Sequence, residues 1–161
     1  MPHDHSRHGD EERIMPSPTR PSLHHVALTV TDLTVSIPWY ERVFGIALKM
    51  EVPHHGGTGM ILADDDMSLF FALHRHDTNE GERFTETHTG LDHIGLGVPS
   101  RADLESWQTH LDAQGIRRSL IADQPCTQSP IEDHFFGSIL VFRDPDNVPI
   151  ELFAPPSTQQ A

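Results

Sequence analysis

The chain has 161 residues, and its 24 acidic and 11 basic residues give a formal net charge of −13 at pH 7. This length suits a single domain with a buried core, and the negative charge argues against nucleic acid and anionic membrane surfaces as partners. No apolar run is long enough for a transmembrane helix and no segment is typical of a signal peptide, so we expect a cytoplasmic protein. The single cysteine, Cys126, cannot form a disulfide within these residues and fits a reducing compartment.

Both ends of the chain have compositions typical of tails. Residues 1–21 contain scattered His and Pro without hydrophobic periodicity, so we expect them to be disordered, and residues 155–161 are interpreted in the same way. The expected domain spans 22–154, with a first module at 22–78, a linker at 79–90 and a second module at 91–154.

An alternating segment opens the first module. In residues 23–33 the large apolar side chains share one face, whereas His25 shares the other face with Ala27 and Thr29. Small residues after the imidazole leave room for a ligand or a metal on that face. By the same alternation His24 is expected to point the opposite way, which favours a structural role.

A helix and three strands complete the first module. The spacing of apolar residues predicts a helix over residues 35–44, with Pro38 in its first turn and Gly45 at its end. The segment Thr31-Asp32, or Thr34, can cap this helix. The strands are expected at residues 47–52, 58–63 and 68–74, with the acidic triplet 64–66 as the turn between the last two.

The second module repeats this plan. His93 opens a strand in which Gly95 and Gly97 share its face. Ser100 is expected to cap the next helix and Gly115 to end it. The later strands are expected near residues 116–122, 138–142 and 148–153.

The sequences of the two halves can be aligned with each other. His25 falls on His93 and Trp39 on Trp107, with the same offset of 68 residues in both cases. Because each helix is also followed by a glycine, the pattern predicts a duplicated β-α-β-β-β unit.

The last segment predicts a β-hairpin around the turn Asp144-Pro145-Asp146-Asn147. In the returning strand, Glu151 takes the face opposite to its apolar neighbours. A carboxylate on the inner face of a fold needs a cation or a metal as its partner. His25, His93 and Glu151, each on a separate strand, therefore form the ligand set of a two-histidine, one-carboxylate metal site.

Three segments, HHVALTVTDLTVSIPWYERVFG, LDHIGLGVPSRADLESW and FRDPDNVPIELF, together resemble the vicinal oxygen chelate superfamily. This superfamily includes glyoxalase I, extradiol dioxygenases, fosfomycin-resistance proteins and bleomycin-binding proteins. The resemblance covers about residues 22–154 and implies an α+β fold, in which two tandem β-α-β-β-β modules form an open, cup-like mixed β-barrel. It also implies a homodimer and a divalent metal ion (Fe²⁺, Mn²⁺, Ni²⁺ or Zn²⁺) at the family ligand positions, which are occupied here by His25, His93 and Glu151.

Glyoxalase I has a fourth ligand, usually glutamate, on the last strand of the first module. Here that strand, residues 69–74, has no acidic residue. His74 is the candidate at this place, either as a fourth ligand or as a catalytic base, and His76 shares its face.

Extradiol dioxygenases have a histidine before the final hairpin and a tyrosine on its first strand. His134 matches the histidine, which makes it a second catalytic candidate; the alternative is a surface loop residue. Val141 occupies the tyrosine position, and Asn147 replaces the glycine of the turn. Without the tyrosine hydroxyl, ordinary catechol cleavage is not expected.

The sequence thus predicts a metal-dependent enzyme that acts on a small oxygenated molecule able to chelate the metal. The ligand set favours a dioxygenase-like reaction. One alternative is a glyoxalase-type isomerase or lyase, and the other is a non-catalytic small-molecule binding protein, as in bleomycin resistance. The expected partners are a small-molecule substrate and a second copy of the chain, without nucleic acid or membrane.

Overall fold

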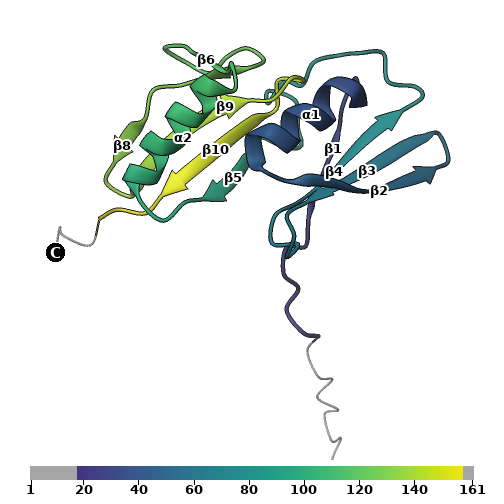
Figure 1. Ribbon diagram of the computed structural model, residues 1–161, viewed down its shortest axis with the longest axis horizontal. Coiled ribbons are helices and arrows are strands. Elements are labelled where there is room, and N and C mark those ends of the chain that lie inside the picture. The colour runs from purple at the N-terminus through teal and green to yellow at the C-terminus, as the bar shows by residue number, and fades with distance from the viewer. Residues whose placement is uncertain (1–17, 158–161) are drawn as a thin grey trace, which may run out of the picture.

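The computed structural model describes residues 18–157 and shows two modules side by side, each with one helix and one sheet (Figure 1). The predicted tail positions 1–17 and 158–161 lie outside the described residues. The first module consists of β1 (Val26–Thr29), α1 (Leu33–Phe44), β2 (Ala47–His54), β3 (Gly57–Ala63) and β4 (Phe70–His76). The second consists of β5 (Ile94–Gly97), α2 (Arg101–Ala113), β6 (Arg117–Arg118), β7 (Thr127–Gln128), β8 (Glu132–His134), β9 (Gly137–Arg143) and β10 (Pro149–Ala154).

Each module has its own sheet. Sheet A has the order β1-β4-β3-β2, and sheet B has the order β5-β10-β9-β7-β6, with β8 paired to β9. The first strand of each module pairs in parallel with the last strand, whereas the hairpin strands pair antiparallel. The predicted α+β fold with a duplicated module is therefore confirmed, with two separate open sheets in the single chain.

The helix of the first module follows the sequence prediction closely. Asp32 caps α1 by accepting a hydrogen bond from the Thr34 amide at 2.8 Å, and Gly45 ends it with φ of 66°. The helix begins earlier than predicted, at Leu33, so Pro38 lies in its second turn. Pro38 lacks an N–H group, and therefore leaves the carbonyl one turn before it without a helical partner.

The second module departs from the prediction between α2 and β9. The single strand expected at 116–122 is only two residues long, and the chain then forms two further short strands, β7 and β8. Pro125 and Pro130 flank β7 and cannot donate to a strand ladder, which limits regular pairing there.

Helix α1 holds the two modules together. Its Tyr40 ring packs on Phe71 of sheet A with centroids 5.1 Å apart, and its Phe44 ring lies 6.1 Å from Phe142 of sheet B. Trp39, which is 1% exposed, also faces Phe142. One helix thus supplies a buried aromatic core to both sheets.

The hairpin turn between β9 and β10 also contacts α1. Asp144 accepts a hydrogen bond from the Tyr40 hydroxyl at 2.9 Å, and Asp146 accepts one from the Thr31 hydroxyl at 2.5 Å. Asn147 has φ of 77°, so it adopts the left-handed conformation expected of a residue that replaces glycine. The turn is therefore part of the interface between the modules.

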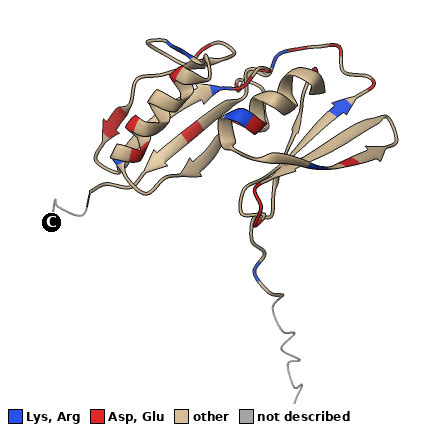
Figure 2. Ribbon diagram, in the orientation of Figure 1, with Lys and Arg blue, Asp and Glu red and all other residues tan. Residues whose placement is uncertain are grey.

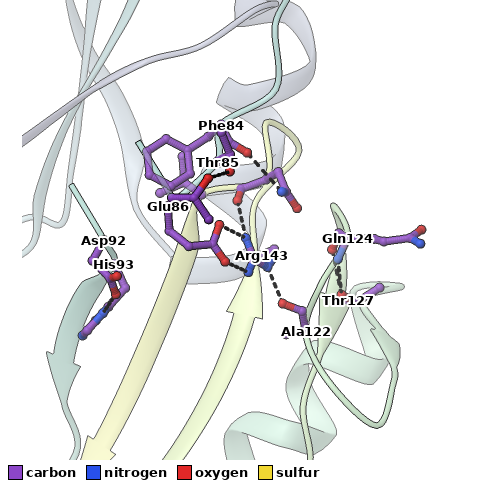
Figure 3. Close-up of polar contacts among 12 residues, drawn as sticks. Phe84, Thr85, Glu86, Asp92, His93, Ala122, Gln124, Thr127 and Arg143 are labelled. Atoms are coloured by element: carbon purple, nitrogen blue, oxygen red, sulfur yellow. Dashed lines mark hydrogen bonds and ion pairs between the residues drawn. The ribbon is translucent and has the colours of Figure 1, made fainter. Parts of the chain in front are cut away.

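Hydrogen bonds and an ion pair hold residues 84–86, which precede β5, against the turn between β9 and β10 (Figure 3). The buried Arg143 side chain pairs with Glu86, with Nη2 and Oε1 2.5 Å apart, and Nη1 donates to the Asn147 carbonyl at 2.9 Å. The Phe84 amide donates to the Asp146 carbonyl at 2.9 Å. These contacts fix the path by which the chain enters β5.

Charged residues of both signs are spread over α2 and the loops, whereas the strands of sheet A are largely uncharged (Figure 2). Among residues 18–157, neither helix has the length and apolar character needed to cross a membrane.

Candidate metal centre

His93 and Glu151 lie on neighbouring strands of sheet B. In the parallel pairing of β5 with β10, Glu151 is opposite Gly95, and His93 is two residues before Gly95. Strand alternation therefore puts the Glu151 carboxylate on the face of Gly95, and the imidazole of His93 stands directly before β5 at this edge of the sheet. Within the described residues, Glu151 makes neither a hydrogen bond nor an ion pair, although it is half-buried. Its oxygens are thus available to a cation.

The face above β5 is open. A Cβ atom built on Gly95 or Gly97 would meet no other atom within 4 Å. The room that the sequence predicted beside the imidazole is therefore present, and it adjoins Glu151. An unpartnered carboxylate, an imidazole and free space together fit a divalent metal ion with open coordination positions.

The neighbouring Asp92 orients His93. Its Oδ1 lies 2.6 Å from Nδ1 of His93 (Figure 3). With the proton on Nδ1, the imidazole donates to this carboxylate and keeps the Nε2 lone pair for a metal. Asp92 was not singled out in the sequence, although its position directly before a candidate ligand was the available signal.

His25 takes the equivalent place in sheet A, directly before β1. Its ring stacks on Phe70 of β4 with centroids 5.0 Å apart. Its Nδ1 lies 2.9 Å from Nδ1 of His24, which leaves Nε2 free. The expectation that His24 points away was wrong, because β1 begins at Val26 and strand alternation does not extend to these two residues.

The three candidate ligands do not form a site within one chain. His25 belongs to sheet A, whereas His93 and Glu151 belong to sheet B, and β1 and β5 are not paired with each other. Among residues 18–157 no three His, Cys, Asp or Glu side chains gather closely enough to hold a metal. The strands β1 and β5 each form an edge of their own sheet, so either edge can adjoin another chain.

His74 lies on the same face of sheet A as His25, but not beside it. It is opposite Thr29, whereas the position next to His25 is occupied by Phe70. Four residues of strand lie between the two positions, so the Cα atoms of His25 and His74 are about 13 Å apart. His74 therefore does not adjoin His25 in the sheet, and its ring neighbours on this face are His54 and His76.

His134 lies at the other end of sheet B, in the short strand β8. Its ring stacks on Phe136 with centroids 4.9 Å apart, and its Nε2 is 3.5 Å from Oε2 of Glu132. It lines a cleft of about 740 Å³ between the start of α2 and the β8–β9 hairpin, which includes neither His93 nor Glu151. The structure therefore leaves the catalytic role of His134 as a prediction.

Val141 lies directly opposite Glu151 in the antiparallel pairing of β9 with β10. The two side chains share one face, as the sequence predicted for the residue at the tyrosine position. A methyl-bearing side chain thus adjoins the candidate carboxylate ligand.

Comparison with known proteins identifies the family of this chain. A family model described as the Glyoxalase/Bleomycin resistance protein/Dioxygenase superfamily matches residues 22–152. The chain belongs to this superfamily. The matched segment contains the first module, all but the last two residues of the second, and all three candidate ligands.

Individual superfamily proteins extend the comparison. The uncharacterized protein YaeR of Escherichia coli K12 is 26% identical over 139 residues, covering 81% of this chain and 94% of YaeR. A glyoxylase/bleomycin resistance protein/dioxygenase domain from Frankia sp. EAN1pec is 27% identical, with a TM-score of 0.74 and coverage of 88% and 96% of the two chains. A mutant of the fosfomycin resistance protein FosX from Listeria monocytogenes, complexed with Mn(II) and 1S,2S-dihydroxypropylphosphonic acid, has the same fold at 18% identity, with a TM-score of 0.57 and coverage of 86% and 94%.

Proposed function

We propose that this superfamily member is a divalent-metal-dependent enzyme whose site forms between two chains, with His25 from one chain and His93 and Glu151 from the other. The unpartnered Glu151 on the face of Gly95, with open space over Gly95 and His93 directly before the same strand, carries this proposal. His25 has the equivalent position on a sheet with a free edge. A homodimer that brings β1 of one chain beside β5 of the other completes the ligand set twice.

The proposed chemistry follows from these ligands. An ion held by two imidazoles and one carboxylate keeps open positions, where it acts as a Lewis acid towards adjacent oxygens of a small substrate. Asp92 orients the His93 ring, and Val141 gives the face beside Glu151 an apolar patch. His134 is proposed to contact a part of the substrate away from the chelated oxygens. Mn(II) in the FosX complex supports a divalent ion in this fold.

The proposal favours a dioxygenase-like reaction, with glyoxalase-type isomerase or lyase chemistry as the alternative. Val141 offers no hydroxyl to a developing oxyanion, and loss of one such donor costs about a hundredfold or more in rate. We therefore expect little turnover of simple catechols with Fe²⁺ and oxygen. Assays on catechols and on the hemithioacetal of methylglyoxal separate the two reaction types, and brisk oxygen-dependent catechol cleavage would show that the role given to Val141 is wrong.

A mixed-dimer experiment tests where the site lies. Chains carrying His25→Ala or Glu151→Gln, each expressed alone, should bind one Mn²⁺ fewer per chain than the unsubstituted protein. In a dimer that contains one chain of each kind, the unsubstituted His25 meets the unsubstituted Glu151 at one of the two sites, so half of the lost metal should return. A control dimer in which one chain carries both substitutions should keep neither site, because each site then lacks one ligand, whereas a site within a single chain would survive in the unsubstituted chain.

The mixed dimer separates the possible results. No recovery of metal, with dimer formation confirmed, would place the site within a single chain. Absence of metal from the unsubstituted protein, purified without an affinity tag, would favour the metal-free binding protein, the third alternative. Melting temperature before and after chelation gives an independent readout, because a bound ion stabilises the folded state.

A further inference from the structure

Sheet A carries a second group of imidazoles, which does not include the proposed ligands His25, His93 and Glu151. His54 at the end of β2 and His74 and His76 at the end of β4 lie on one face of the sheet. The ring of His54 is 5.3 Å from each of the other two, centroid to centroid, and His74 and His76 are 6.2 Å apart. We call these three residues the histidine cluster.

Two glycines of the middle strand make this cluster possible. Strand β3 runs between β2 and β4, and its Gly57 lies opposite both His54 and His76, while Gly59 lies opposite His74. A Cβ atom on Gly59 would come within 2.7 Å of the His74 ring, and one on Gly57 within 2.9 Å of the His54 ring and closer still to the Arg75 carbonyl oxygen. The rings therefore extend across β3 through space that any other residue would occupy.

The spacing of the nitrogens suits a shared ion. Nδ1 of His74 and Nε2 of His54 are 3.3 Å apart, which is long for a hydrogen bond. Two nitrogens at zinc–imidazole distance on a tetrahedral ion are about 3.4 Å apart. Ring centroids in such a site are separated by about 5 Å, close to the spacing of the cluster.

No Asp or Glu shares this face of β2, β3 and β4, where the other side chains are apolar or small.

We propose that His54, His74 and His76 bind a transition metal ion of the Zn²⁺ class, at a site separate from the His25, His93 and Glu151 site. In the present geometry two nitrogens already have the required separation, whereas the His76 ring has to turn to bring its nitrogen to the same point, in agreement with the absence of a converged trio among residues 18–157. About 13 Å of strand separates His74 from His25, so the two ions would not bridge. The ion would fasten the edge strand β2 to β4 across β3.

The site is tested by metal binding to the full-length chain in a background where His3, His5 and His8 of the tail are replaced by alanine. Co²⁺ absorption spectra report four-coordinate geometry, and Zn²⁺ competition gives affinity. The substitution Glu151→Gln is added to remove the first site, so that this test is independent of the proposed function. One Co²⁺ per chain with a four-coordinate spectrum is expected.

Three variants decide the assignment. His54→Ala and His76→Ala should each weaken Zn²⁺ binding by about a hundredfold or more, since even outer contacts of a metal site are worth tenfold to a hundredfold. Gly59→Ala, which keeps all three imidazoles but displaces the His74 ring, should weaken it as well. His55→Ala is the matched control, because His55 adjoins His54 but lies outside the cluster, and it should bind Zn²⁺ normally.

Two results would overturn the assignment. One is Zn²⁺ affinity unchanged by His54→Ala and His76→Ala, and the other is an equal loss of affinity with His55→Ala. Melting temperatures without metal check that each variant folds, and only the unsubstituted cluster and the control should gain stability when Zn²⁺ is added.

Discussion

The two modules share one plan but leave room for ligands in different places. In sheet B the glycines lie in the edge strand β5, and the space above Gly95 and Gly97 is empty. In sheet A the glycines lie in the middle strand β3, and the His74 ring already fills the space above Gly59. The position of glycines in a duplicated sheet therefore shows where each copy has to accommodate a bulky group or a ligand.

The modules also differ in how they are built into the whole. Helix α1 packs aromatic side chains against both sheets, whereas α2 contacts the strands of sheet B. The turn after β9 is buried and hydrogen-bonded to the first module, whereas the turn between β3 and β4 is exposed. Although each module has its own sheet, the first module thus depends on the second for part of its core.

The largest expected effect on stability comes from substitutions in the aromatic core that α1 shares with both sheets. Phe142→Ala in sheet B and Phe71→Ala in sheet A should each lower the free energy of unfolding by about 3–5 kcal/mol, the usual cost of a large cavity. Because α1 contacts both rings, each variant should still unfold in a single transition. Calorimetry checks this, and two separate transitions in either variant would mean that the modules are independent.

A smaller effect on the free energy of unfolding, with its own pH dependence, is expected at the buried turn between β9 and β10. Burial raises the pKa of the Asp144 carboxyl from 3.8 to about 6. The folded protein therefore holds this proton more tightly than the unfolded chain does, so the group stabilises most below pH 4 and loses that contribution as pH rises to about 6. The difference between these two pKa values corresponds to at most about 3 kcal/mol of unfolding free energy. Asp144→Asn should abolish this part of the fall in unfolding free energy between pH 4 and 7.

The matching turn of the first module provides the control. Hydrogen bonds from Ser68 and Leu69 lower the pKa of Asp64, which is the opposite direction from Asp144. Asp64→Asn should therefore leave the fall between pH 4 and 7 in place. If Asp144→Asn and Asp64→Asn gave the same pH profile, burial of the second turn would not be its cause. Denaturant unfolding at each pH supplies the measurement.

Local patterns predicted the elements whose causes are local. The Asp32 cap, the Gly45 end of α1 and the left-handed Asn147 all follow from neighbouring residues or from one short hairpin. The sequence also predicted which residues share the faces of β5 and β10.

Features that depend on distant strands were not predicted. The histidine cluster requires the register of three strands, in which His54 and His76 meet across Gly57. The contact of His24 with His25 depends on where β1 begins, and the separation of the two sheets depends on packing around α1. Periodicity within a segment contains none of this information, which is why the expected convergence of the ligands could not specify whether one chain or two supplies them.

The smallest effect that we expect compares the helix caps of the two modules. The Asp32 carboxylate accepts hydrogen bonds from both the amide and the hydroxyl of Thr34, at 2.8 and 2.7 Å, whereas the Ser100 hydroxyl accepts from the Asp103 amide at 3.4 Å. Asp32→Ala should therefore lower the melting temperature by roughly 2 to 4 °C, and Ser100→Ala by less.

Since α1 belongs to both cores, loss of its cap should destabilise the whole protein, and no separate melting of the first module should appear. Asp32→Asn, which keeps an acceptor at the cap, is the matched control and should melt near the unsubstituted protein. An equal or larger loss in Ser100→Ala would contradict the view that α1, and not α2, is the helix on which both modules depend.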